Sequence, residues 1–173
     1  MNPEQQYAQA KKLYEEGQLQ EAVQAFEHAR AGYLAQHDTA NAAQATNDLG
    51  VVYYLAGRRD EALRVLQEAL TMFEQLGDVT GQAKALGNLA RVHERQGDRD
   101  TAEKNYQRAA ELFRQAGDKG LEADTWRALS QMQLQQGRWL EALSTYDRAL
   151  AARGGSGALR AFLRLPLRLT GIR

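Results

Sequence analysis

The sequence has 173 residues, is 43% hydrophobic and has a formal net charge of zero, so it holds enough apolar surface for one folded domain or one short solenoid. It contains no cysteine, which excludes disulfides, thiolate metal sites and cysteine nucleophiles. Its longest apolar run, 49–56, is far shorter than the roughly 20 residues of a membrane-spanning helix, and its first residues lack the pattern of a signal peptide, so we expect a cytoplasmic protein.

A 40-residue internal repeat runs through most of the chain, the kind of self-similarity that marks repeat architectures. Glycines recur at this step at Gly17, Gly57, Gly97 and Gly137. Small residues recur at Ala22, Ala62, Ala102 and Ala142, and again at Ala29, Ala69, Ala109 and Ala149. A large residue lies between the two alanines of each unit, namely Phe26, Leu66, Tyr106 or Tyr146. The chain therefore consists of repeated units in register.

Apolar residues at helical spacing flank each of these glycines, for example Leu66 and Leu70. Each glycine then falls in a turn between two helices, where a left-handed backbone costs a residue without Cβ nothing. Asp38, Asp78 and Asp118 stand where the next helix needs an N-cap. The pattern predicts an all-α chain with helices at about 3–16, 19–36, 39–56, 59–76, 79–96, 99–116, 119–136 and 139–152.

The same residues resemble tetratricopeptide repeats, whose pattern is a large residue, Leu, Gly or Ala, Tyr, and then Ala, Phe and Ala. The second repeat reads Thr46, Leu49, Gly50, Tyr53, Ala62, Leu66 and Ala69. A step of 40 residues in place of about 34, without the usual closing proline, is similar to the long-repeat branch of this family. The resemblance implies a right-handed superhelical α-solenoid over 1–152, built from four helix–turn–helix repeats at about 3–38, 39–78, 79–118 and 119–152, and followed by a C-terminal tail.

The resemblance also implies a non-catalytic scaffold whose first helices line a concave groove that binds a partner protein or peptide. The positions carried over from the family give the expected partner-binding residues: Tyr7, Lys11, Tyr14, Asn47, Val51, Tyr54, Lys84, Asn88, Arg91, Arg127 and Gln131. The amides of Asn47 and Asn88 are expected to bond an extended peptide backbone. The side chains of Lys84, Arg91 and Arg127 are expected to pair with acidic groups, so the expected peptide is partly acidic. The alternative is an ordinary polar wall that binds nothing.

The rest of the sequence contains no recognisable catalytic or metal-ligating pattern. His28, His37 and His93 are far apart, and none stands at a metal-ligand spacing from a carboxylate or another histidine. The glycine-rich stretch at 154–157 lacks the lysine and helix of a nucleotide site. We therefore expect no enzymatic activity, no metal and no cofactor.

The C-terminal segment differs from the body in charge. Residues 153–173 carry five of the 22 basic residues and no acidic one, which leaves 17 basic and 22 acidic residues, a net charge of −5, in 1–152. An acidic body makes nucleic acid an unexpected partner. Residues 153–157 form a Gly-rich break, either within a degenerate fifth repeat or as an added linker. Residues 158–173 form a Leu/Arg-rich tail whose pattern suits a helix or a strand.

The tail is expected to serve the end of the solenoid, because a repeat protein needs a terminal cap. Leu159, Phe162 and Leu163 are expected to pack against the last repeat of the same chain or of a neighbouring molecule. We favour a cap or an exchange between subunits over contact with an anionic membrane and over a disordered tail. The alternative function is therefore a self-assembling structural unit, a homo-oligomer joined through solenoid ends and tail.

Overall fold

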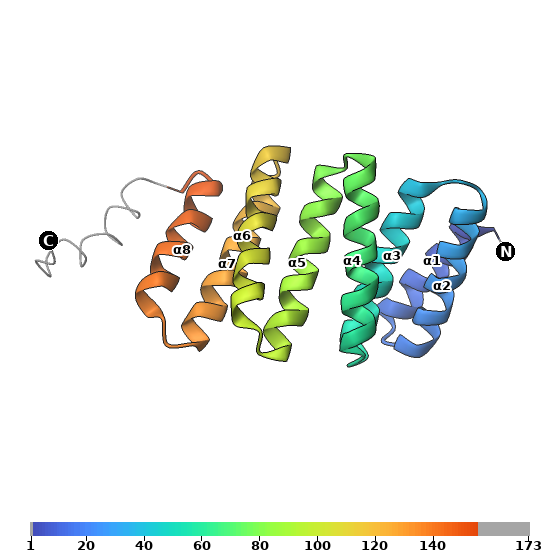
Figure 1. Cartoon of the computed structure of the whole chain (residues 1–173), viewed down its shortest axis with the longest axis horizontal. Coiled ribbons are helices and arrows are strands. Elements are labelled where there is room, and N and C mark those ends of the chain that lie inside the picture. Colours follow the sequence, from blue (N-terminus) through green and yellow to red (C-terminus); the bar gives the residue numbers. More distant parts are fainter. Residues whose placement is uncertain (1, 156–173) are drawn as a thin grey trace, which may run out of the picture. The chain divides into compact units, whose positions relative to one another are not determined.

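The computed structural model describes residues 2–155 of the chain. Within this range the only regular elements are α-helices, which confirms the all-α expectation. Figure 1 labels them as α1 (Pro3–Glu15), α2 (Leu19–Ala35), α3 (Thr39–Leu55), α4 (Arg59–Leu76), α5 (Val79–Gln96), α6 (Arg99–Ala116), α7 (Lys119–Gln135) and α8 (Trp139–Ala152). These bounds agree with the expected ones to within one residue.

The aspartates of the 40-residue series cap helices as expected. The carboxylates of Asp38, Asp78 and Asp118 accept a hydrogen bond from the backbone N–H three residues later, at 3.1, 2.9 and 2.9 Å. They begin α3, α5 and α7, because each satisfies a backbone donor that has no partner inside its helix.

The glycines of the series lie in the turns between paired helices. Gly17, Gly57, Gly97 and Gly137 have φ values of 77°, 77°, 86° and 76°, in the left-handed region that glycine enters without steric cost. The turn between the first and second repeats has His37 at φ 58° where the later turns have glycine, so this turn holds a less favourable residue.

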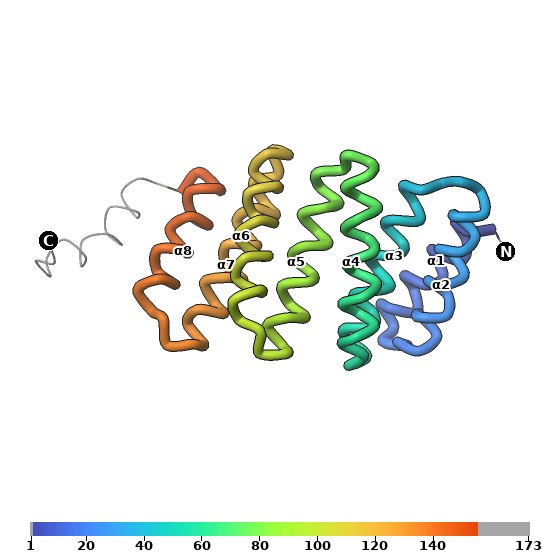
Figure 2. Tube along the Cα trace, viewed as in Figure 1, coloured from blue at the N-terminus to red at the C-terminus, as the bar shows by residue number. Residues whose placement is uncertain are grey.

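The described chain divides into two compact units at Asn105 and Tyr106, inside α6. In the first unit α1 packs on α2, α2 on α3, α3 on α4, and α5 on both α3 and α4; the Cα trace in Figure 2 shows consecutive helices reversing direction. The packing is close. A Cβ added to Gly50 of α3 would lie 2.5 Å from Cγ of Leu66 on α4, so glycine permits this helix contact.

The second unit is described by itself. In it α7 packs on α8, and the Ser130 hydroxyl donates to the Ala142 carbonyl at 2.7 Å. The buried Trp126 of α7 lies under Arg148 of α8, whose Cζ is 5.0 Å from the ring centroid. Helix α8 ends at Ala152, directly before the expected Gly-rich break. The right-handed superhelix stays a prediction.

Candidate functional site

A pocket of about 440 Å³ opens in the first unit. Its lining comes from the first helices of three successive repeats, α1, α3 and α5, together with α2. The lining residues are Tyr7, Lys11, Tyr14, Phe26, Gln44, Asp48, Val51, Val52 and Lys84. Five of the expected partner-binding residues lie here: Tyr7, Lys11, Tyr14, Val51 and Lys84.

Asp48 of α3 is the centre of a polar cluster in this pocket. Its Oδ2 accepts a hydrogen bond of 2.5 Å from the Tyr7 hydroxyl of α1. Its Oδ1 accepts bonds of 2.8 Å from the Gln44 amide and 3.1 Å from the Asn47 amide. Burial, and then the bond to the Asp48 carboxylate, raise the pKa of Tyr7 well above its usual value. Tyr7 therefore keeps its proton and donates to Asp48 throughout the neutral pH range.

The cluster continues from α3 to α5. The Asn88 amide donates to Oδ1 of Asn47 at 3.1 Å, and 41 residues separate these partners, as they separate Tyr7 and Asp48. Asn47 is only 4% exposed. Its amide nitrogen therefore donates to Asp48 and its amide oxygen accepts from Asn88. We reassign Asn47 from contact with a ligand backbone to support of the pocket.

Tyr54 and Arg91 form a second contact between α3 and α5. The guanidinium Cζ of Arg91 lies 5.2 Å from the centroid of the Tyr54 ring, a cation–π arrangement. Arg91 is exposed and Tyr54 is half-buried, so the guanidinium keeps donors available to an acidic group.

Arg127 and Gln131, the remaining expected residues, belong to α7 in the second unit and do not line the pocket. Both are exposed. Arg127 pairs with Asp124, which also accepts a bond of 2.7 Å from Arg153. Its charge is thus already partnered, which lowers its availability for an acidic ligand.

Gln44 and Asp48 are pocket residues that the sequence analysis did not select. They occupy the same repeat positions as Lys84 and Asn88, one step of 40 residues earlier. Applying the edge positions of the third repeat to the second would have found both. The buried Phe26, whose ring centroid lies 5.6 Å from that of Tyr7, was identified only as the large residue of the repeat pattern and also lines the pocket.

The described residues show neither a metal site nor a membrane-spanning helix, and they do not include the tail. In residues 2–155 no three His, Cys, Asp or Glu side chains gather in a way that suits a metal ion. No helix in the described part of the chain has the length and apolarity to span a membrane. Leu159, Phe162 and Leu163, the expected tail contacts, lie outside the described residues.

A family model described as "Tetratricopeptide repeat" matches residues 6–75 and 81–154. A comparison with curated proteins gives no match.

Several solved structures are similar in fold. The crystal structure of BtubC from P. vanneervenii has a TM-score of 0.75 and 23% identity, covering 87% of this chain and 62% of that one. A Rap protein complexed with Competence and Sporulation Factor has a TM-score of 0.80 and 20% identity, covering 88% and 42%. A Podosopora anserina putative kinesin light chain with nearly identical repeats has a TM-score of 0.70 and 15% identity, covering 98% and 97%. The chain thus spans less than two thirds of BtubC and of the Rap protein, and at these identities the likeness shows the fold alone.

Proposed function

Because the chain belongs to the tetratricopeptide repeat family, we propose that it is a protein-interaction scaffold that binds a segment of a partner in the pocket formed by α1, α3 and α5. The observation that carries the proposal is the pocket itself: three successive first helices contribute to one recess of about 440 Å³. Pockets of roughly 300–1,000 Å³ with an apolar lining and a few placed polar groups are typical binding sites. The similar Rap protein forms a complex with Competence and Sporulation Factor, which is consistent with such a use of the fold.

The pocket is preorganised by hydrogen bonds between the helices that line it. The Tyr7–Asp48 and Asn47–Asn88 bonds hold α1, α3 and α5 to one another through side chains. A preorganised site loses less conformational entropy on binding than a loose one. These polar residues then support the pocket, and the exposed side chains recognise the ligand. The absence of catalysis and the cytoplasmic location stay predictions.

A pair of matched substitutions tests the proposal. Val51 lines the pocket, and Gln131 stands 80 residues later in the equivalent position of α7, outside it. Peptides are selected on the full chain from a random display library, and their affinities are measured by fluorescence polarisation. We expect Val51→Arg to weaken binding by at least about tenfold, a loss of about 1.4 kcal/mol, and Gln131→Arg to leave it unchanged. Equal affinities for both variants would refute the pocket as the binding site.

A second candidate function, self-assembly through the end of the second unit, is favoured by one observation. Trp139, Leu140 and Tyr146 of α8 are 64%, 44% and 40% exposed, and exposed apolar side chains gathered on one helix are typical of contact surfaces. If this candidate is correct, removal of residues 153–173 should change the number of chains per particle, which is calculated from the mass measured in solution. A mass that corresponds to one chain for both proteins, at all concentrations measured, would exclude it.

A further inference from the structure

The pocket of α1, α3 and α5 combines an apolar recess with two exposed lysines. The rings of Tyr7, Tyr14 and Phe26 and the side chain of Val51 provide the apolar surface. Lys11 of α1 and Lys84 of α5 line the same pocket and are exposed. The recess therefore offers burial to an apolar group and places two positive charges beside it.

The carboxylate of Asp48 lies in the same pocket but forms no ion pair with either lysine. Its oxygens accept three hydrogen bonds, from a phenol and two amides, and none of these donors is charged. Such bonds stabilise a carboxylate in place without a cation. Two lysines and one aspartate line the pocket, so their formal charges sum to +1, and the three hydrogen bonds of the aspartate come from neutral donors.

The two lysines have no acidic partner within the described residues. Lys11 lies 6.0 Å from the centroid of the Tyr7 ring, and neither Lys11 nor Lys84 is among the ion pairs of residues 2–155. Lys12, the next residue along α1, instead pairs with Glu16 at 3.8 Å. Adjacent lysines of one helix thus differ: one is paired on the surface, and the other lines the pocket with its charge available.

From this arrangement, and resting on the proposed function, we propose that the pocket selects a peptide segment in which a large apolar side chain is flanked by Asp or Glu. The apolar side chain enters the recess between Tyr7, Tyr14 and Val51. The flanking carboxylates pair with Lys11 and Lys84, which are too exposed to pay a large desolvation cost. A basic segment is disfavoured, because it would meet two like charges against a single carboxylate.

Four synthetic peptides of nine residues test this selectivity. Three have Phe at the centre of a Gly/Ser backbone and differ only in the flanking pair, which is Glu, Gln or Lys; the fourth keeps the Glu pair and replaces Phe with Ala. Binding to the full chain is followed by NMR chemical-shift changes at peptide concentrations up to about 1 mM, which detects complexes with a dissociation constant of that order. We expect the Glu–Phe peptide to bind tightest, at least about fivefold above the Gln–Phe and Glu–Ala peptides, with no binding of the Lys–Phe peptide.

Charge reversal on the protein completes the experiment. Lys11→Glu combined with Lys84→Glu should abolish the preference for the Glu flank and produce a preference for the Lys flank. Lys12→Glu, the matched control on the same helix, should leave the order of affinities unchanged. Since all three positions are exposed, the variants are expected to fold as the parent does, and thermal melting checks this.

The possible outcomes separate this inference from the proposed function. If the Phe peptides bind equally whatever their flanks, and Val51→Arg still abolishes binding, the acidic selectivity is wrong and the pocket remains the binding site. If none of the four peptides binds, the inference is overturned, while peptides selected from the library still decide the proposed function. A reversal of preference by Lys12→Glu alone would also overturn it, since that charge lies outside the pocket.

Discussion

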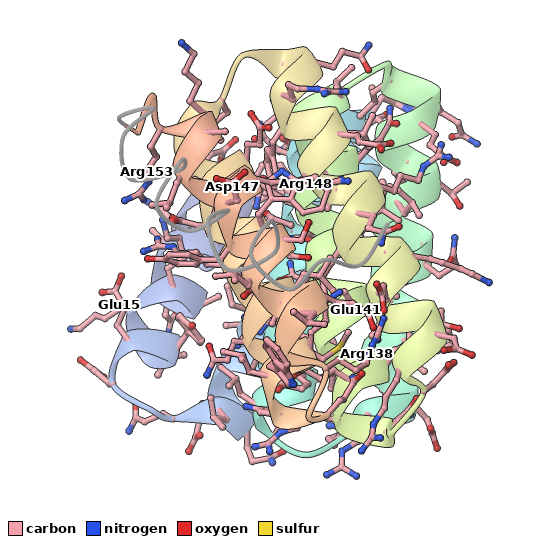
Figure 3. All side chains as sticks on the ribbon, turned by 90° about the vertical axis from the view of Figure 1, so that its left-hand side faces the viewer. Glu15, Arg138, Glu141, Asp147, Arg148 and Arg153 are labelled. Carbon is pink, nitrogen blue, oxygen red and sulfur yellow. The ribbon has the colours of Figure 1, made fainter. Side chains whose placement is uncertain are left out.

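Tyr33 and Phe73 occupy the same repeat position as Arg153, yet their surroundings are opposite. Tyr33 of α2 is buried with Ala42 and Ala45 of α3, and Phe73 of α4 lies so close to α5 that a Cβ on Gly81 would be 2.2 Å from its ring. Arg153, which Figure 3 labels directly after α8, is exposed. It pairs with Asp124. This position is aromatic where the first helix of a following repeat covers it, and charged after the last described helix. This aromatic position therefore contributes to the part of the core that lies between repeats, in addition to the packing of paired helices inside each one.

The largest expected effect contrasts these two residues. Phe73→Ala should destabilise the protein by about 3–5 kcal/mol, because it leaves a cavity between α4 and α5. Arg153→Ala should cost less than about 1 kcal/mol, because it removes an exposed ion pair. Urea unfolding followed by circular dichroism gives both values. Similar losses for the two variants would mean that burial between repeats does not determine the contribution of this position.

Two glycines within helices sharpen the contrast between packed and open positions. A Cβ on Gly50 would meet the buried Leu66, whereas a Cβ on Gly87 of α5 would meet nothing within 4 Å. Gly50→Ala should therefore destabilise by about 1–3 kcal/mol, and Gly87→Ala should stabilise by about 0.5–1 kcal/mol through its higher helix propensity. Opposite shifts in the thermal midpoint are the expected result. A gain in stability from Gly50→Ala would contradict the close contact of α3 and α4, and a loss from Gly87→Ala would contradict the open position of Gly87.

A smaller effect should appear at alkaline pH. Burial, and then the 2.6 Å bond to Glu27, raise the pKa of Tyr53 to about 12. Between pH 10 and 12 the unfolded chain loses this phenolic proton while the folded chain keeps it, so stability present below pH 10 is lost as the pH rises. We expect a loss of about 1–2 kcal/mol from this residue. Tyr53→Phe should reduce the slope of unfolding free energy against pH in this window; an unchanged slope would refute the assignment.

The smallest effect concerns the turn after the first repeat. His37 has φ 58°, and Gly77 and Gly117 hold the equivalent positions with φ values of 67° and 78°. His37→Gly should stabilise by about 0.5 kcal/mol, the relief of a left-handed side chain less the added entropy of the unfolded chain. Differential scanning calorimetry measures the shift, with Gly77→His as the reverse change. A gain in stability from Gly77→His would show that the turn does not discriminate between these residues.

The sequence predicted the helices well because their boundaries depend on local chemistry. Glycine turns and aspartate caps act over one helical turn, and their 40-residue step marked most of the boundaries, with His37 in place of glycine after the first repeat. The pocket was predicted only in part, because which side chains of α1, α3 and α5 meet depends on how successive repeats approach. Asn47 illustrates this: its position in the repeat suggested a surface amide, yet packing against α5 buries it. Asp48 was missed although its bond to Tyr7 has the same sequence separation as that of Asn47 and Asn88.

The equal separation of these two bonds fixes the order of the repeats. The separation is 41 residues in both cases, one more than the length of the repeat, so each bond joins two neighbouring repeats. Tyr7 finds its acceptor in Asp48, and Asn47 finds its donor in Asn88. A chimera that places the third repeat directly after the first would set Tyr7 against Asn88 and remove the carboxylate. In that chimera the Tyr7 hydroxyl would meet a neutral amide oxygen in place of a carboxylate, so we expect a weaker bond between neighbouring repeats and a less stable solenoid.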